Sequence, residues 1–225
     1  QEAGRPAAAA DAGQPAAGLA AGPFLCPELV VPEGKECKLV VPRLPLSSLG
    51  NGGKVSICDQ HGVPVLRACF SFLACPGGVR GPRLREMKRL VLTSATGETA
   101  FAFCREAEAV AAGSGRPSRL ALYHRSEEPF GVLSADGFEA GSGYSVVTQK
   151  GCTIYFRAGM KAGVMNATDD SGRLLAVVEP SGQTQTLLRV GQLVDAGLIT
   201  LTIMGIDVLE NGGPGSRSDA ELNAL

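Results

Sequence analysis

Short runs of alternating apolar and polar residues, joined by tight turns, fill the chain from position 36 to 188. Two such runs around a turn that ends in Gly are typical of a β-hairpin, because Gly takes the positive φ that closes the turn. Asp, Ser or Thr at the first turn position can accept a hydrogen bond from the backbone ahead of it. The turns are Asp59–Gly62, Ser94–Gly97, Thr148–Gly151 and Asp169–Gly172, with a looser turn at Ser126–Gly131.

These turns divide the chain into strand pairs. The expected pairs are Val55–Cys58 with Val63–Ala68, Arg89–Thr93 with Thr99–Phe103, Arg119–Tyr123 with Phe130–Ser134, Tyr144–Val147 with Cys152–Phe156, and Ala162–Asn166 with Arg173–Val178. Adding Glu36–Val41 before them and Thr184–Leu188 after them gives about twelve strands. A sheet of that size tends to curl, and its closure removes the unpaired edges. The sequence therefore predicts an antiparallel barrel with a wide interior.

The most apolar stretch of the chain is Val190–Glu210. As a helix of about 21 residues it would be roughly 31 Å long, and its apolar side chains on every face describe a helix enclosed by protein or lipid. A β-strand is the alternative, because Ile199 and Leu201 alternate with Thr200 and Thr202. The length of the run favours a helix over about 190–210, and the fold class is then all-β with one helix that fills the barrel.

Two acidic residues argue against a membrane span by this helix. Asp195 and Asp207 leave only about 11 residues between them, whereas a spanning helix needs about 20 apolar ones. Inside a barrel both carboxylates would be costly unless paired. We therefore expect Asp195 to cap the helix or face the barrel mouth, and Asp207 to find a basic or backbone partner at the other end.

The ends of the chain differ in composition from its centre. Residues 1–22 are rich in Ala, Gly and Pro and cannot bury enough side chain to offset their ordering entropy, which predicts a disordered tail or linker. Residues 23–211 form the expected barrel domain, and 212–225 a flexible polar tail after a Gly-Gly-Pro-Gly stop. No secretory signal is visible, and a chain that begins with Gln can be a fragment lacking an upstream targeting segment.

Charge and cysteine content limit the classes of partner, the cofactors and the compartment that we expect for this chain. The net charge is -1, so no global field draws the chain to nucleic acid. The 7 cysteines include no Cys-x-x-Cys pair, and we expect most of them to be buried, reduced thiols. We find no metal-ligand set and no cofactor-binding loop. A cytoplasmic location, or a peripheral one at a membrane surface, is expected.

A meander of about twelve strands followed by one apolar carboxy-terminal helix resembles the tubby carboxy-terminal-like fold. That group includes tubby proteins, the plant LURP-one-related proteins and the phospholipid scramblases. The resemblance spans roughly Cys26 to Glu210, and the segment from Asp195 to Glu210 carries most of its specificity, because a similar helix with an acidic residue near each end threads the barrel in the scramblase and LURP-one branches. The resemblance implies no single function, since one fold hosts unrelated sites.

The densest charge cluster is a candidate lipid-headgroup site. Clustered Arg and Lys side chains can hold a phosphoinositide or an anionic membrane surface even when the net charge is near zero. The alternative is a solvated loop that leads into a strand. The residues of this cluster are Arg80, Arg83, Arg85, Lys88 and Arg89.

Other reactive residues suggest no chemistry. His61 lies in an expected turn and His124 at a strand end, and neither has a recognisable nucleophile or orienting acid beside it in the sequence. The carboxylates of Asp169 and Asp170 are explained by their turn. No catalytic residue is predicted, and the chain is expected not to be an enzyme.

The leading hypothesis is a non-enzymatic binding or adaptor module that recognises phosphoinositide or anionic lipid surfaces. The alternative is a structural or protein-interaction subunit, in which strand edges and loops contact another protein. A scramblase-like protein is disfavoured by Asp195 and Asp207.

Overall fold

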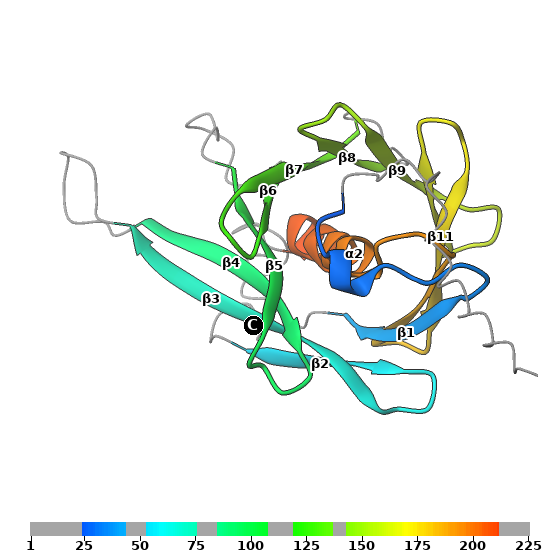
Figure 1. Cartoon of the computed structure of the whole chain (residues 1–225), viewed down its shortest axis with the longest axis horizontal. Helices are drawn as coiled ribbons and strands as arrows, with labels where there is room; N and C mark the ends of the chain where they lie inside the picture. The colour runs from blue at the N-terminus through cyan, green and yellow to red at the C-terminus, as the bar shows by residue number, and fades with distance from the viewer. Residues whose placement is uncertain (1–23, 44–52, 76–84, 108–118, 137–142, 212–225) are drawn as a thin grey trace, which may run out of the picture.

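The computed structural model describes residues 24–43, 53–75, 85–107, 119–136 and 143–211, with the backbone alone for 71–75, 85–88 and 211. The strands form one closed antiparallel barrel in the order β1-β12-β11-β10-β9-β8-β7-β6-β5-β4-β3-β2. Each strand pairs with its neighbour in sequence, and β1 closes the barrel on β12. In Figure 1 the view runs down this barrel, and helix α2 lies in its centre.

The elements follow the turn signals of the sequence. Their bounds are η1 Pro27–Leu29, β1 Cys37–Pro42, β2 Lys54–Asp59, β3 Pro64–Cys75, β4 Arg85–Ser94, β5 Ala100–Glu106, β6 Arg119–His124, β7 Pro129–Ala135, β8 Tyr144–Thr148, β9 Thr153–Ala158, β10 Met165–Asp169, β11 Leu174–Ser181, β12 Gln185–Val190 and α2 Ala196–Asn211. The prediction of an antiparallel barrel of about twelve strands around one helix is confirmed.

The tight turns close as expected. The last glycines of the four Gly-ending turns all have positive φ, between 80° and 83°. In the looser turn Glu127 takes the left-handed conformation with φ 68°. The prediction for β10 was wrong by three residues at its start, because Gly163 has φ 77° and extends the preceding turn to Val164.

The helix begins later than the sequence pattern predicted. Val190 is the last residue of β12, and α2 begins at Ala196. Leu193 has φ 60°, which ends the extended backbone, and Asp195 Oδ1 accepts the Leu198 N–H at 2.8 Å, which starts the helix. The apolar run therefore contains a strand end, a turn and all but the last residue of the 16-residue helix α2.

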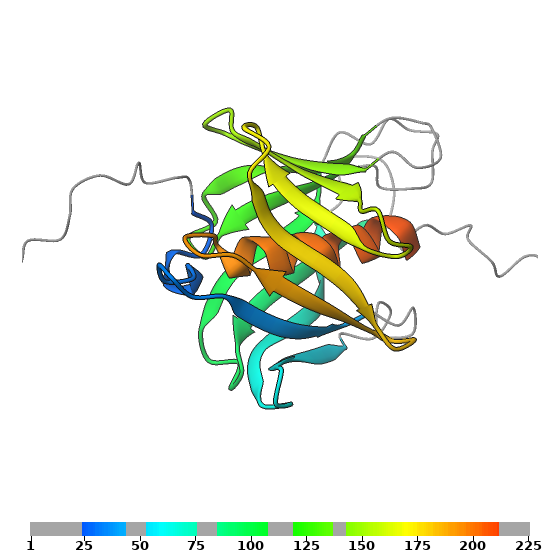
Figure 2. The same ribbon diagram turned by 90° about the vertical axis from the view of Figure 1, so that its right-hand side faces the viewer.

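The side chains of helix α2 fill the interior of the barrel and form its core together with the inward-facing strand residues. Figure 2 shows it running along the barrel interior. Ile199, Leu201 and Met204 are fully buried, at 0% exposure each. Two glycines let the helix pack closely against its surroundings. A Cβ at Gly205 would lie 2.9 Å from Leu133 Cδ2 of the barrel, and one at Gly197 would lie 2.6 Å from Cys26 Sγ of the segment before β1. No helix among the described residues is long and apolar enough to cross a membrane.

The segment before β1 lies across the barrel end at the start of α2, as Figure 2 shows. Leu25 and Cys26 are buried there, and the Val31 N–H donates to the Val194 carbonyl at 2.9 Å. Asp195 receives the Cys26 N–H on Oδ2 at 2.7 Å. The expectation that Asp195 caps the helix at the barrel mouth is thus confirmed, and residues 24–32 form a plug over that mouth.

The described cysteines are free. Cys26 and Cys104 are buried, which agrees with the expectation for a core thiol. Cys152 is exposed and Cys37, Cys58 and Cys69 are only half-buried, so the expectation that most cysteines are buried was wrong for these positions. The reason is their place on strand ends, turns and the outer face rather than beside α2.

Candidate functional site

Arg89 is the residue of the predicted basic cluster whose side chain the structure describes. It lies on the outer face of β4, because the neighbouring Leu90 is buried in the core. Its guanidinium carbon sits 3.6 Å from the centroid of the Phe103 ring. Phe103 is only 3% exposed although it is outside the barrel core, so Arg89 acts as its cover.

The remaining cluster residues are placed less completely. Arg85 and Lys88 belong to β4, where they are in register with Cys75 and Phe72 of β3. Arg80 and Arg83 lie outside the described residues. The headgroup role predicted for these five positions therefore stays a prediction.

The Phe103 ring of β5 also stacks on the Tyr123 ring of the neighbouring strand β6. Phe103 and Tyr123 are parallel, with ring centroids 5.0 Å apart and an interplanar angle of 8°. Arg105 lies over Tyr123 at 4.5 Å and donates from Nη2 to the Tyr123 hydroxyl at 3.0 Å. We call these four side chains, Arg89, Phe103, Tyr123 and Arg105, the cation–aromatic wall.

The wall carries a pair of like charges. Arg89 and Arg105 are directly opposite each other in the β4–β5 ladder. The ion pair of Arg89 with Glu127 is long, at 3.9 Å, and the Glu127 side chain is largely exposed. Arg89 Nε is buried without a hydrogen-bond partner among the described residues. The wall is therefore rich in cationic donors and poor in acceptors.

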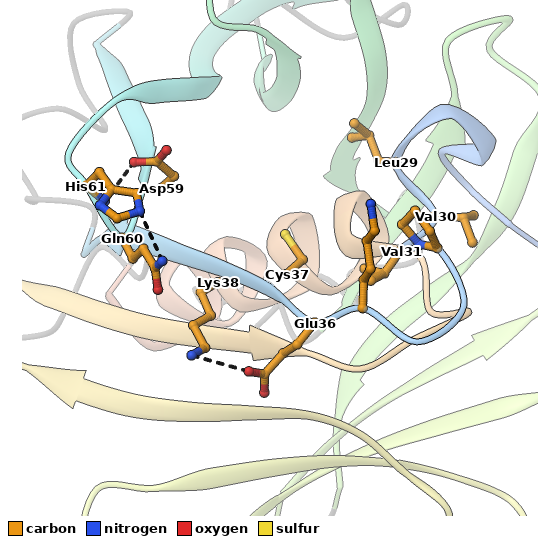
Figure 3. Close-up of a pocket in the computed structure, with 11 residues that line it drawn as sticks. Leu29, Val30, Val31, Glu36, Cys37, Lys38, Asp59, Gln60 and His61 are labelled. Atoms are coloured by element: carbon orange, nitrogen blue, oxygen red, sulfur yellow. Dashed lines mark hydrogen bonds and ion pairs between the residues drawn. The ribbon is translucent and has the colours of Figure 1, made fainter.

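A cavity of about 570 Å³ opens at a different place, between β1, the β2–β3 turn and the plug. Figure 3 shows Asp59–His61 of the turn on one side of it, Leu29–Val31 of the plug on the other, and Glu36–Lys38 between them. Burial raises the pKa of the Cys37 thiol at its base. We call this space the seam cavity.

Both carboxylates at the seam cavity already form hydrogen bonds or ion pairs within the chain. Asp59 Oδ1 accepts the N–H groups of Val63 and His61, and these hydrogen bonds lower its pKa. Glu36 pays a desolvation cost that would raise its pKa, but hydrogen bonds and attraction from Arg189 and Lys38 lower it. Both groups remain charged, and neither is free to act as a base.

A second cavity, of about 330 Å³, lies beside the start of α2. Its floor is apolar and includes Leu175 and Leu198, and its rim includes Asp169 and Asp170. Asp169 accepts hydrogen bonds from Ser171 and Arg173, and Asp170 accepts the Thr153 N–H at 2.7 Å. The contacts of Asp169 agree with the turn role expected for it, whereas Asp170 binds the start of β9 instead of its own turn.

The histidines have structural contacts. His124 Nδ1 lies 3.1 Å from the Leu25 carbonyl oxygen and its ring packs edge-on against Phe130, so it holds the plug. His61 lines the seam cavity, beside Gln60. No group of three or more metal-ligating side chains occurs in the part of the chain that the structure describes.

Comparison with known proteins identifies a solved structure with a similar fold. No protein-family profile matches the chain, and no curated protein matches it either. Among solved structures it is similar to an X-ray structure of an Arabidopsis thaliana protein of the LURP-one-related group, at a TM-score of 0.53 and 12% identity over 85% of this chain and 99% of that one. The likeness shows the fold. At 12% identity it gives no information on a functional site, which must be argued from the residues of this chain.

Sequence reasoning singled out Arg89 but missed its surroundings. Phe103, Tyr123 and Arg105 lie on strands that were predicted, but their stacking depends on the register between three strands. No sequence pattern marked Lys35 and Cys37 as cavity residues, because the seam cavity forms only where β2 diverges from β1 in the folded barrel. An alternation count would not have found this wall, because Phe103 and Arg105 lie on the same face of β5 and the apolar Phe103 favours an inward face for both.

Proposed function

We propose that the chain is a non-enzymatic binding or adaptor module of the tubby carboxy-terminal-like superfamily, and that it recognises anionic lipid surfaces, including those with phosphoinositides. The observation that carries this proposal is the opposition of Arg89 and Arg105 on the outer face of β4 and β5. The other basic residues of β4, Arg85 and Lys88, continue the same strand.

Like charges directly opposite in an antiparallel ladder destabilise the pair unless something offsets them. Phe103 and Tyr123 offset part of the cost, because each ring faces one guanidinium. An anion placed between the two guanidinium groups would offset the rest, since planar guanidinium groups donate two parallel hydrogen bonds to phosphate.

The shape of the wall favours a surface over an enclosed small molecule. It is the outside of a barrel, and the two cavities described above lie elsewhere and include none of its four residues. Arg119, exposed on β6, lies two positions from Ala121, the partner of Arg105, and extends the row of cations. A row of cations on a convex face suits the headgroup layer of an anionic membrane.

Vesicle co-sedimentation of the full chain tests the proposal. The vesicles contain phosphatidylcholine alone, phosphatidylcholine with phosphatidylserine, or phosphatidylcholine with a small fraction of phosphatidylinositol bisphosphate, at low and moderate salt. We expect selective pelleting with anionic vesicles that weakens with salt. Arg105→Gln and Arg119→Gln should each weaken binding about fivefold, the effect of about 1 kcal/mol per cation near the surface.

Lys150→Gln is the matched control, because Lys150 is an exposed cation in the β8–β9 turn. Charge reversal at Arg83, Arg85 and Lys88 tests the sequence-predicted cluster in the same assay. Absence of pelleting with every vesicle would overturn the proposal. So would equal loss of binding in the Lys150 and Arg105 variants, since the effect would then be one of net charge and not of this wall.

A further inference from the structure

Among the described residues, the ladder between β1 and β2 is the shortest of the barrel. It consists of the pairs Leu39 with Asp59 and Val40 with Cys58. On its other edge β1 is paired along its whole length with β12, from Cys37 with Val190 to Pro42 with Gln185. The amino-terminal part of β1 is therefore held from one side by the sheet and borders the seam cavity on the other.

The cause of this short ladder lies in the β2–β3 turn. Asp59 accepts the N–H groups of His61 and Val63, and the Gly62 N–H donates to the Asp59 carbonyl. These bonds turn the chain at Asp59, so Gln60 and His61 leave the direction of β2 and become the far wall of the cavity, as Figure 3 shows.

The opposite wall is fixed as well. The Gly34 N–H donates to Gln192 Oε1 at 2.6 Å, and the Lys35 N–H donates to the Pro32 carbonyl at 3.2 Å. The Val31 N–H donates to the Val194 carbonyl, which ties this wall to the residues just before α2. Both walls are therefore built by hydrogen bonds before any ligand arrives, which lowers the entropy cost of binding.

The charges of the cavity select the ligand. Glu36 is shared by Lys38 and Arg189, and Asp59 is occupied by backbone N–H groups. Within the described chain neither Lys35 nor His61 forms an ion pair. The remaining lining is apolar, from Leu29 to Pro32, with the Cys37 thiol at the base.

We propose that an extended segment of a partner protein, with apolar and acidic residues in alternation, binds the seam cavity as an added strand beside Glu36–Lys38. Strand addition to an edge gives affinity through main-chain hydrogen bonds and specificity through pockets for alternate side chains. Successive side chains of a strand point to opposite faces, so the apolar ones reach Val31 and Cys37 while the acidic ones meet Lys35 and His61. This site is separate from the cation–aromatic wall and does not depend on it.

Backbone NMR of the full chain, under reducing conditions, tests this proposal with two capped synthetic hexapeptides. One alternates valine with glutamate and the other alternates valine with lysine. We expect the glutamate peptide to shift the amide signals of Lys35 to Lys38 and of Gln60 and His61, and the lysine peptide to leave them unchanged. Lys35→Glu should weaken the glutamate peptide about tenfold, a free-energy change of about 1.4 kcal/mol.

A charge swap separates this site from general attraction. The double variant Lys35→Glu, His61→Glu should bind the lysine peptide and reject the glutamate peptide. Lys161→Glu, an exposed position in the β9–β10 turn, is the matched control and should bind like the unchanged chain. The proposal fails if the glutamate peptide causes no shifts at millimolar concentration, if the shifts lie away from β1 and the β2–β3 turn, or if the charge swap does not exchange the preference.

Discussion

The Cys26 backbone N–H donates to Asp195 Oδ2 at 2.7 Å, across 169 positions of sequence. The same carboxylate accepts the Leu198 N–H on Oδ1 at 2.8 Å, so one side chain both starts α2 and holds the plug. Asp195 is 3% exposed. Its burial raises its pKa to about 6, although the backbone N–H groups of Cys26 and Leu198 act in the opposite direction.

The contribution of Asp195 to the stability should therefore fall as the pH rises from about 4 to about 6. A carboxyl whose pKa is higher in the folded state binds more protons there than in the unfolded chain, and the folded state loses this advantage when the group ionises. A rise from 3.8 to about 6 corresponds to about 3 kcal/mol. Urea unfolding at several pH values measures it. Asp195→Asn should flatten the difference between pH 4 and pH 6, and an equal slope in the variant would contradict this assignment.

Gly197→Ala should destabilise the protein by roughly 1–3 kcal/mol, the cost of overpacking. Inside a helix this change normally stabilises by about 1 kcal/mol, so the sign is diagnostic. The added Cβ would lie 2.7 Å from Cys26 Cβ and 2.8 Å from Leu29 Cδ1. Thermal and urea unfolding give the sign. The double variant Cys26→Gly, Gly197→Ala should recover part of the loss, and a stabilised single variant would show that the plug does not press on α2.

Thr200→Val and Thr202→Val should each stabilise the protein by about 1 kcal/mol. Both hydroxyl oxygens are fully buried and have no hydrogen-bond partner among the described residues. Valine has nearly the same shape without the polar atom, so the substitution removes a desolvation cost and leaves the packing intact. Urea unfolding measures the change, with Thr153→Val on β9 as the less buried control. A loss of stability would mean that the hydroxyls are satisfied.

The contact between Arg89 and Phe103 should show a coupling free energy of about 0.5–1 kcal/mol. A double-mutant cycle with Arg89→Met and Phe103→Leu measures it by urea unfolding. Methionine keeps part of the cover over the ring but not the charge, so the cycle isolates the cation–π term from burial. Additive effects of the two substitutions would show that Arg89 covers Phe103 by its alkyl chain alone.

The hairpins were predictable because their signals are local. A turn such as Asp169–Gly172 contains both the residue that accepts the backbone hydrogen bonds and the glycine with positive φ. The face of each strand was harder to predict. Ala102 and Cys104 point inward and the larger Phe103 points outward, the reverse of what side-chain size alone favours. Cys104 Sγ lies 4.0 Å from where a Cβ at Gly205 would sit, so the inward face of β5 packs against α2. That choice depends on a helix about 100 positions later in the chain.

The plug and the seam cavity could not be predicted for a related reason. Residues 24–32 have no periodicity, and their position is fixed by Asp195 and Val194 near the other end of the domain. The length of the β1–β2 ladder depends on where the β2–β3 turn leaves the sheet. Composition separated β12 from α2 but could not locate the start of the helix, because Val190 and Val194 are as apolar as the helix and only Leu193 and Asp195 mark the break.

The pairing of Cys37 with Val190 has a consequence for the time course of folding. On a growing chain the early strands have neither the strand that closes the barrel nor the helix that fills it, because both come last. Contacts of such long range form slowly, and apolar strand faces stay uncovered until α2 docks. Most of the folding of this domain should therefore follow the synthesis of residue 211, and the nascent chain should depend on chaperones until then.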